Sequence, residues 1–274
     1  MRDPARHARG GNITIRYRPV AEAPRHLFDS WPQVARRLRA AKGWLLLLDF
    51  DGTLTPITSH PRDSKLNPGV GRILRRLAGN PRARVYVISG RPLAYLRRTL
   101  KVPGVHLLGL YGWERLGVSL PAGERRRLLK TKQWLGQRLA NAPGIKLEDK
   151  GLALAIHYRG ARLPVVRRAR GVVREALACF QPWVRLQEGR KTWELLPPFI
   201  DGKAATARKL LARPRSRWLP ICAGDDASDE SAFAVIRRGL TIHVGRWTHT
   251  RARFWLRNSE EVKEFLGRLE DLAT

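Results

Sequence analysis

One stretch of the sequence constrains the fold more than any other: the four leucines Leu45–Leu48 lead directly into Asp49 and Asp51. A continuous apolar run of this length predicts a strand that is buried on both faces, as in the middle of a parallel sheet. In open α/β sheets, ligands bind at the carboxyl ends of the strands, where these two acids lie. Because buried carboxylates are costly unless they are paired or hold a cation, the stretch predicts an acidic site at a strand end.

Two further predicted strands end in polar groups that suit the same site. Residues 84–88 form an apolar strand that ends at Ser89-Gly90-Arg91, and residues 218–223 form another that ends at Gly224-Asp225. Ser89, Gly90 and Arg91 can bind phosphate oxygens, and the helix that starts at Pro92 directs its positive end at an anion. The alternative for this segment is an ordinary turn from a strand into a helix.

The segment between about residues 115 and 196 follows a different pattern. Two predicted helices, at 124–140 and 163–180, accompany an alternating strand at 152–159 and a hairpin at 183–194. The alternation predicts one apolar face, for the segment's own helices, and one polar face that is free to cover something. The sequence therefore predicts an inserted cap.

The predicted fold class is α/β, with a Rossmann-like, doubly wound parallel-sheet core and an inserted α+β cap. A basic N-terminal arm and a lead-in helix occupy residues 1–40, with a possible edge strand at 12–15. The core comprises residues 41–114 and 197–274, and the cap comprises residues 115–196.

The composition favours an anionic partner. Lysine and arginine number 53 against 23 acidic residues, a net charge of +30, which suits nucleic acid, an acidic membrane surface or a phosphorylated small molecule. An arginine-rich proteome or a heat-adapted surface would explain the excess equally well. The arginines are scattered over nearly every predicted helix, which argues against a nucleic-acid footprint. No apolar run reaches membrane-spanning length. Cys179 and Cys222 are predicted to be buried free thiols, which suits a reducing cytoplasm.

The order of these motifs resembles that of the haloacid dehalogenase-like phosphatases, whose first motif is Asp-x-Asp-x-Thr, here Asp49 to Thr53. The resemblance implies that Asp49 attacks phosphorus and becomes an aspartyl-phosphate. Asp51 would protonate the leaving oxygen and then activate water. Ser89 and Lys203 would hold the phosphoryl oxygens.

The same resemblance implies a magnesium ion. Mg²⁺ would lie between the Asp49 carboxylate, the Asp51 backbone carbonyl and Asp225, with Asp226 and Asp229 supporting it from nearby. Oxygen ligands without a cluster of histidines or cysteines also favour a hard cation. For Asp226, an exposed acid that caps a helix is an open alternative.

The cap sequence resembles that of the trehalose-6-phosphate phosphatases. The similar segments of the cap are Glu148–Gly151, His157–Arg159 and Gly189 with Glu194, and the core segment Gly224–Phe233 is also similar. The resemblance implies a sugar-phosphate substrate, recognised by Glu148, Lys150 and Glu194 with His157 and Arg159 nearby, and a functional pairing with a trehalose-6-phosphate synthase. The alternatives are a solvated turn for 148–150, a surface strand charge for Arg159, and turn residues for Arg190 and Lys191 unless they face the core.

Three positions depart from the family pattern. Asp201-Gly202-Lys203 stands where Asp-Lys-Gly is usual, and one step along a helix turns a side chain by about 100°. Either the loop compensates and Lys203 still reaches phosphate, or its role has shifted. Leu196 replaces a common arginine, and Tyr111 a common histidine.

Two other functions remain open at this point. One is a phosphatase of the same superfamily for another sugar phosphate, such as a sucrose or mannosylglycerate precursor. The other is a polyanion-binding protein on the same fold, which the complete set of catalytic acids makes less favoured.

Overall fold

The computed structural model describes residues 23–58, 64–114, 121–189, 191–200, 202–212, 218–247 and 249–273. The possible strand at residues 12–15, the turn residue Arg190 and the predicted cap boundary at residue 115 lie outside these ranges. The domain boundaries therefore stay predictions, although the division into two sheets is clear.

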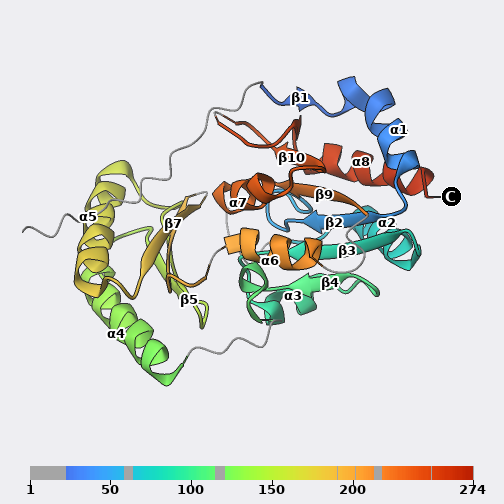
Figure 1. Ribbon diagram of the computed structural model, residues 1–274. Helices are drawn as coiled ribbons and strands as arrows, with labels where there is room; N and C mark the ends of the chain where they lie inside the picture. The colour runs from blue at the N-terminus through green and yellow to red at the C-terminus, as the bar shows by residue number, and fades with distance from the viewer. Residues whose placement is uncertain are drawn as a thin grey trace, which may run out of the picture.

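The core is a seven-stranded sheet whose neighbouring strands are all parallel (Figure 1). In spatial order the strands are β1 (Arg25–His26), β11 (Phe254–Leu256), β10 (Leu240–Val244), β9 (Leu219–Gly224), β2 (Trp44–Leu48), β3 (Ala83–Ile88) and β4 (His106–Leu108). The leucine run is β2, between β3 and β9. The three polar strand ends are therefore adjacent at one edge of the sheet.

Helices cover both faces of this sheet, so the predicted doubly wound fold is confirmed. Leu46 and Leu48 of β2 belong to a buried cluster with α1 (Trp31–Ala40), α2 (Pro68–Gly79), α3 (Leu93–Thr99) and α8 (Ser259–Asp271). Leu47 belongs to a second cluster, with α6 (Gly202–Leu211) and α7 (Ala227–Val235). Successive leucines thus face opposite layers, as the pleat of a strand requires.

The cap has its own antiparallel sheet of four strands, in the order β5-β6-β8-β7. The strands are β5 (Lys146–Asp149), β6 (Leu154–His157), β7 (Arg185–Gly189) and β8 (Thr192–Leu196), and the helices are α4 (Ala122–Leu139) and α5 (Leu163–Phe180). Leu154, Ile156 and Leu195 pack against both helices. In Figure 1, α4 and α5 lie on the side of the sheet away from the core, so its other face is turned toward the core.

Two predictions about burial are wrong. The strand predicted at 152–159 is shorter, and Ala153, on its supposedly exposed face, is 3% exposed. A small apolar cluster explains this burial, because Ala153 packs with Tyr111 and Ile200 of the core. Cys179 is exposed on α5, whereas Cys222 is buried; both thiols are free. Among the helices within the described ranges, none combines the length and the apolar character needed to cross a membrane.

A described residue shortly before the cap lies close to one shortly after it. The rings of Trp113, near the end of the first core segment, and Phe199, shortly after β8, have a centroid distance of 5.9 Å in an edge-to-face arrangement. Aromatic pairs of this geometry are stabilising beyond the area that they bury. The contact thus holds the chain before the cap beside the chain after it.

Candidate active site

Asp49 and Asp225 meet at the carboxyl edge of the core sheet, as the sequence predicts. Asp49 follows β2 and Asp225 follows β9, which are paired strands. Gly52 has a φ of 84°, and a Cβ atom there would lie 2.2 Å from Asp225 Oδ2. Glycine is therefore required for both the turn and the close approach of its backbone to the carboxylate.

Three carboxylates form a compact cluster at this edge. Asp49, Asp225 and Asp229 each offer an oxygen atom, and these atoms lie within 4.8 Å of one another. Asp49 and Asp229 are buried. Burial raises the pKa of Asp49 to about 6, although Lys203 counteracts it, and burial raises the pKa of Asp229 well above its usual value. The cluster therefore has the oxygen donors and the excess negative charge that suit a hard cation.

Lys203 reaches this cluster despite the altered order of residues at the start of α6. Its ammonium group lies 2.5 Å from Asp49 Oδ1 and 2.7 Å from Asp229 Oδ1, and the residue is 2% exposed. Burial alone would lower the pKa of Lys203, but Asp229 and Asp49 outweigh it and hold the pKa well above the usual value. The altered order therefore still brings Lys203 to Asp49, and its contact with phosphate stays a prediction.

Asp226 caps a helix, one of the two roles predicted for it. Its Oδ1 accepts hydrogen bonds from the Ser228 backbone N–H at 2.8 Å and from Ser228 Oγ at 2.6 Å, and Asp229 Oδ2 accepts from the Asp226 N–H at 3.3 Å. This reciprocal arrangement is a capping box at the start of α7. The capping box at the start of α7 thereby holds the Asp229 side chain beside Asp49.

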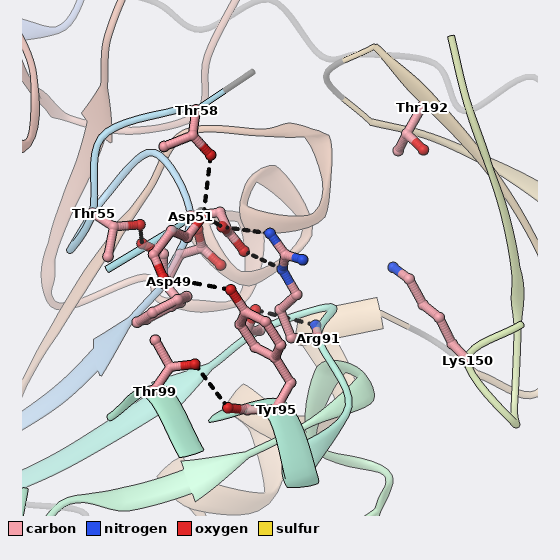
Figure 2. Close-up of polar contacts among 12 residues, drawn as sticks. Asp49, Asp51, Thr55, Thr58, Arg91, Tyr95, Thr99, Lys150 and Thr192 are labelled. Carbon is pink, nitrogen blue, oxygen red and sulfur yellow. Dashed lines mark hydrogen bonds and ion pairs between the residues drawn. The ribbon is translucent and has the colours of Figure 1, made fainter. Parts of the chain in front are cut away.

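Asp51 is not part of the three-carboxylate cluster and instead pairs with an arginine (Figure 2). Arg91 Nε lies 2.7 Å from Asp51 Oδ2 and Arg91 Nη2 lies 2.8 Å from Oδ1, and Ser64 Oγ donates to Oδ1 at 2.7 Å. The guanidinium carbon of Arg91 is 4.6 Å from the centroid of the Tyr95 ring. A bidentate pair of this kind fixes the orientation of both groups.

One cavity of about 440 Å³ joins the two domains. Apart from Lys203, Asp226 and Asp229, every predicted site residue lines it: Asp49, Asp51, Ser89, Gly90, Arg91, Glu148, Lys150, His157, Arg159, Glu194 and Asp225. In Figure 2, Lys150 and Thr192 of the cap lie opposite Asp51 and Arg91 of the core. Residues that the sequence analysis left out of the site also line it: Ile57, Thr58, Ser64, Gly144, Lys146, Gly160, Lys191 and Thr192.

The cap wall carries two carboxylates, each with a cationic or imidazole partner. Glu148 Oε2 lies 2.7 Å from His157 Nε2, and Glu194 Oε1 lies 2.5 Å from Lys150 Nζ. The hydrogen bond with His157 is the largest influence on the pKa of Glu148 and lowers it. Glu148 lies within β5, so the alternative of a solvated turn is wrong for this residue.

Two basic residues of the cap face the cavity for different reasons. Arg159 Nη1 donates to the Thr58 backbone oxygen at 2.7 Å, so this arginine contacts the core. Lys191, at the turn between β7 and β8 with a φ of 60°, also lines the cavity. For Lys191, the structure therefore favours a role in the site over that of a plain turn residue. The signal in the sequence was its position two residues after Gly189, on the same hairpin as Glu194.

Tyr111 contacts the cap, although the sequence analysis noted this residue only because it replaces a common histidine of the family. Its hydroxyl donates to Glu194 Oε2 at 2.5 Å, which links the core to the cap. Burial raises the pKa of Tyr111 well above its usual value, and Glu194 adds to the effect. The hydroxyl therefore remains protonated as a donor.

Comparisons with known proteins agree with this geometry. A family model described as "Trehalose-phosphatase" matches residues 47–253. "Probable trehalose-phosphate phosphatase 3" of Oryza sativa is 30% identical over 263 residues, which cover 84% of this chain and 70% of that protein. "Trehalose-phosphate phosphatase" of Mycobacterium ulcerans is 32% identical over 243 residues, which cover 82% of this chain and 60% of the relative.

A solved structure gives the same fold. The C-terminal domain of the trehalose-6-phosphate phosphatase of C. albicans superposes with a TM-score of 0.78 at 23% sequence identity, over 92% of this chain and 99% of that domain. The parallel core sheet and the separate inserted sheet are therefore an arrangement that known proteins also have.

Proposed function

We infer that this chain, which belongs to the trehalose-phosphatase family, is a phosphoric monoester hydrolase that converts trehalose 6-phosphate into trehalose and phosphate. One observation carries the inference. Asp49, at the end of the central strand, and the carboxylates of Glu148 and Glu194 on the cap line the same cavity. A reactive acid and a set of hydroxyl-binding groups thus face one another across a space that a phosphorylated disaccharide can enter.

The proposed reaction proceeds in two displacements. In the first, a carboxylate oxygen of Asp49 forms a bond to phosphorus as the bond between phosphorus and the sugar oxygen breaks, and Asp51 gives that oxygen its proton. In the second, Asp51 takes a proton from water while the water oxygen attacks phosphorus. Phosphate leaves, and the Asp49 carboxylate is restored.

The phosphoryl group would be bound by Lys203 and by residues of the loop that follows β3. Lys203 is already in contact with the Asp49 carboxylate. Ser89 is buried at the end of β3, and its Oγ accepts a hydrogen bond from the Arg91 backbone N–H at 3.2 Å. Gly90 and Arg91 line the cavity beside them. Arg91 would hold Asp51 before the substrate arrives and contact the phosphoryl group afterwards.

The three-carboxylate cluster fits a magnesium ion. Asp49 and Asp229 are buried beside a single described ammonium group, that of Lys203, so a divalent cation would balance the remaining charge. Asp49, Asp225 and the Asp51 backbone carbonyl would hold the ion, with Asp229 and Asp226 fixing their surroundings. When bound, Mg²⁺ would shield the negative charge of the phosphoryl group as Asp49 approaches it.

Recognition of the sugar is assigned to the cap. Glu148, Lys150 and Glu194 offer acceptors and donors from one sheet face, with His157 and Arg159 beside them. A site built to hydrogen-bond hydroxyls discriminates strongly, because a wrong sugar leaves buried polar groups without partners. We further propose that the protein acts in the cytoplasm, where a trehalose-6-phosphate synthase would supply its substrate.

The test is phosphate release from a panel of sugar phosphates, with Mg²⁺ and after its removal with a chelator. We expect trehalose 6-phosphate to have the highest kcat/KM, and activity to disappear on chelation and return with Mg²⁺. A higher kcat/KM for sucrose 6-phosphate or mannosyl-3-phosphoglycerate would contradict the assigned substrate. No phosphatase activity, together with salt-sensitive binding of nucleic acid, would instead indicate a polyanion-binding protein.

A further inference from the structure

The side chain of Tyr111 crosses from the core to the cap and binds the carboxylate of Glu194. The hydroxyl lies 2.5 Å from Glu194 Oε2, and Lys150 Nζ lies 2.5 Å from Oε1. Tyr111 is 5% exposed and Glu194 is 4% exposed, so these groups meet out of water. A charge-assisted hydrogen bond in such surroundings fixes the orientation of the carboxylate.

The backbone of Tyr111 is held in an unusual conformation by the loop Ser89–Arg91, the proposed phosphate-binding loop. Leu110 and Tyr111 are consecutive residues other than glycine with φ angles of 45° and 62°, a left-handed conformation that side chains disfavour. The Tyr111 N–H donates to the Ser89 oxygen at 2.8 Å, and the Leu110 N–H donates to the Arg91 oxygen at 2.9 Å. Thr206 Oγ1 donates to the Tyr111 oxygen at 2.6 Å.

The same loop leaves room for the ring of Tyr111. A Cβ atom at Gly90 would lie 2.9 Å from the Tyr111 hydroxyl oxygen and 3.0 Å from Cζ. Glycine therefore lets the ring lie against the loop and reach the cap. The phosphate-binding loop thus sets both the backbone and the ring position of a residue that ends on Glu194.

We propose that Tyr111 is a positioning residue for sugar recognition, which holds the Glu194 carboxylate in its working orientation when the cap lies on the core. The inference rests on the proposed function, because that function gives Glu194 a sugar to bind. A carboxylate has about four acceptor positions. Glu194 therefore keeps positions for sugar hydroxyls after Tyr111 and Lys150 have each donated one hydrogen bond.

The main test is Tyr111→Phe, which removes the hydroxyl and keeps the ring. We expect the ratio of kcat/KM for trehalose 6-phosphate to kcat/KM for p-nitrophenyl phosphate to fall about tenfold, mostly through KM for the sugar phosphate. Tyr158→Phe is the matched control, because Tyr158 stacks on Trp193 of the cap sheet at 4.2 Å. In Tyr158→Phe, the ratio of the two kcat/KM values should not change. An unchanged ratio in Tyr111→Phe, or an equal loss with both substrates, would overturn the proposal.

A double-mutant cycle separates positioning from a general structural role. If Tyr111 acts through Glu194, Tyr111→Phe should change the ratio much less in a Glu194→Gln background than in the wild-type protein. Additive effects would overturn the proposal. The melting temperature of each variant checks that it is folded.

A measurement without substrate keeps the inference separate from the proposed function. A fluorescent donor on the exposed Cys179 of α5 and an acceptor on Lys101→Cys of the core report the distance between the domains. Tyr111→Phe should lower the energy transfer, because it removes a contact between core and cap, and unchanged transfer would overturn the inference. A wild-type protein that does not prefer trehalose 6-phosphate would refute the proposed function instead.

Discussion

The core wall and the cap wall of the cavity hold their charged groups in different ways. On the core wall, Asp49, Asp51 and Arg91 come from the ends of parallel strands and form tight pairs, Asp49 with Lys203 of α6 and Asp51 with Arg91. On the cap wall, they stand on the face of an antiparallel sheet. The Glu148–His157 pair remains partly exposed there, at 38% and 24% of the side-chain surface.

This difference between the two walls suggests a division of roles, with the reaction on the core wall and sugar recognition on the cap wall. Strand ends backed by two helical layers hold a few groups rigidly, which suits a reaction that every phosphate ester shares. A sheet face offers several adjacent side chains, which suits a patterned surface of hydroxyls. Glu194 is intermediate, because it belongs to the cap but is buried beneath Tyr111 of the core. The predictions below test this division from the largest effect to the smallest.

Substitution of the nucleophile should have the largest effect, and should not depend on the substrate. Asp49→Asn should lower kcat about 10⁴-fold or more for sugar phosphates and p-nitrophenyl phosphate alike, because no covalent intermediate can form. Circular dichroism should show an intact fold. Retained activity with either substrate would refute the role of Asp49.

Loss of the buried lysine should reduce both stability and activity. Lys203→Met leaves Asp49 and Asp229 without the ammonium group, and breaking a buried pair in this way typically costs about 3–5 kcal/mol of unfolding free energy. Activity should fall about 10²-fold or more with every substrate. Lys209→Met, on an exposed position of the same helix, is the control and should change the free energy of unfolding by less than about 0.5 kcal/mol. A loss of activity that differs between substrates would contradict the division between chemistry on the core and recognition on the cap.

Substitution on the cap should change the choice of substrate. Glu194→Ala should lower kcat/KM for trehalose 6-phosphate by about 10–100-fold, because sugar hydroxyls lose an acceptor. Hydrolysis of p-nitrophenyl phosphate should fall much less. Equal losses would show that Glu194 supports the fold and does not read the sugar.

The smallest effect concerns the exposed pair on the cap. The pKa of Glu148 is lowered, so its pairing with His157 stabilises the fold above the usual pKa of 4.5, and this contribution is lost as the pH falls through the lowered value. His157→Ala should therefore raise the pKa of Glu148 toward its usual value. Carbon-13 NMR titration of the Glu148 carboxyl group measures the change. At neutral pH, we expect stability to fall by about 0.5 kcal/mol.

The sequence predicted the core well because its signals are local. The leucine run marks β2, and the helix predicted at 163–180 has the bounds of α5. The short strands β1, at the edge of the sheet, and β11, beside it, were not predicted. Arg25 and His26 carry no alternating pattern, and their partners in β11 lie more than two hundred residues away. The polar sequence of β5 resembles a turn, and its pairing with β6 makes it a strand.

The site was predictable where residues follow strand ends and less so where distant segments meet. Asp49, Ser89 and Asp225 were placed correctly at one edge from the order of strands alone. That Lys203 still reaches Asp49 could not be predicted, because a change of order at a helix start leaves the side-chain direction open. Tyr111 was missed as a contact because its partner Glu194 is 83 residues away, on another sheet.

The ring contact between Trp113 and Phe199 brings together the chain before the cap and the chain after it. If the cap moves on the core, this contact between the chain before it and the chain after it would favour a hinged swing over a slide along the edge of the sheet. The face that carries Glu148 and Glu194 would then follow one arc, and would return to the same register above Asp49 after each product leaves.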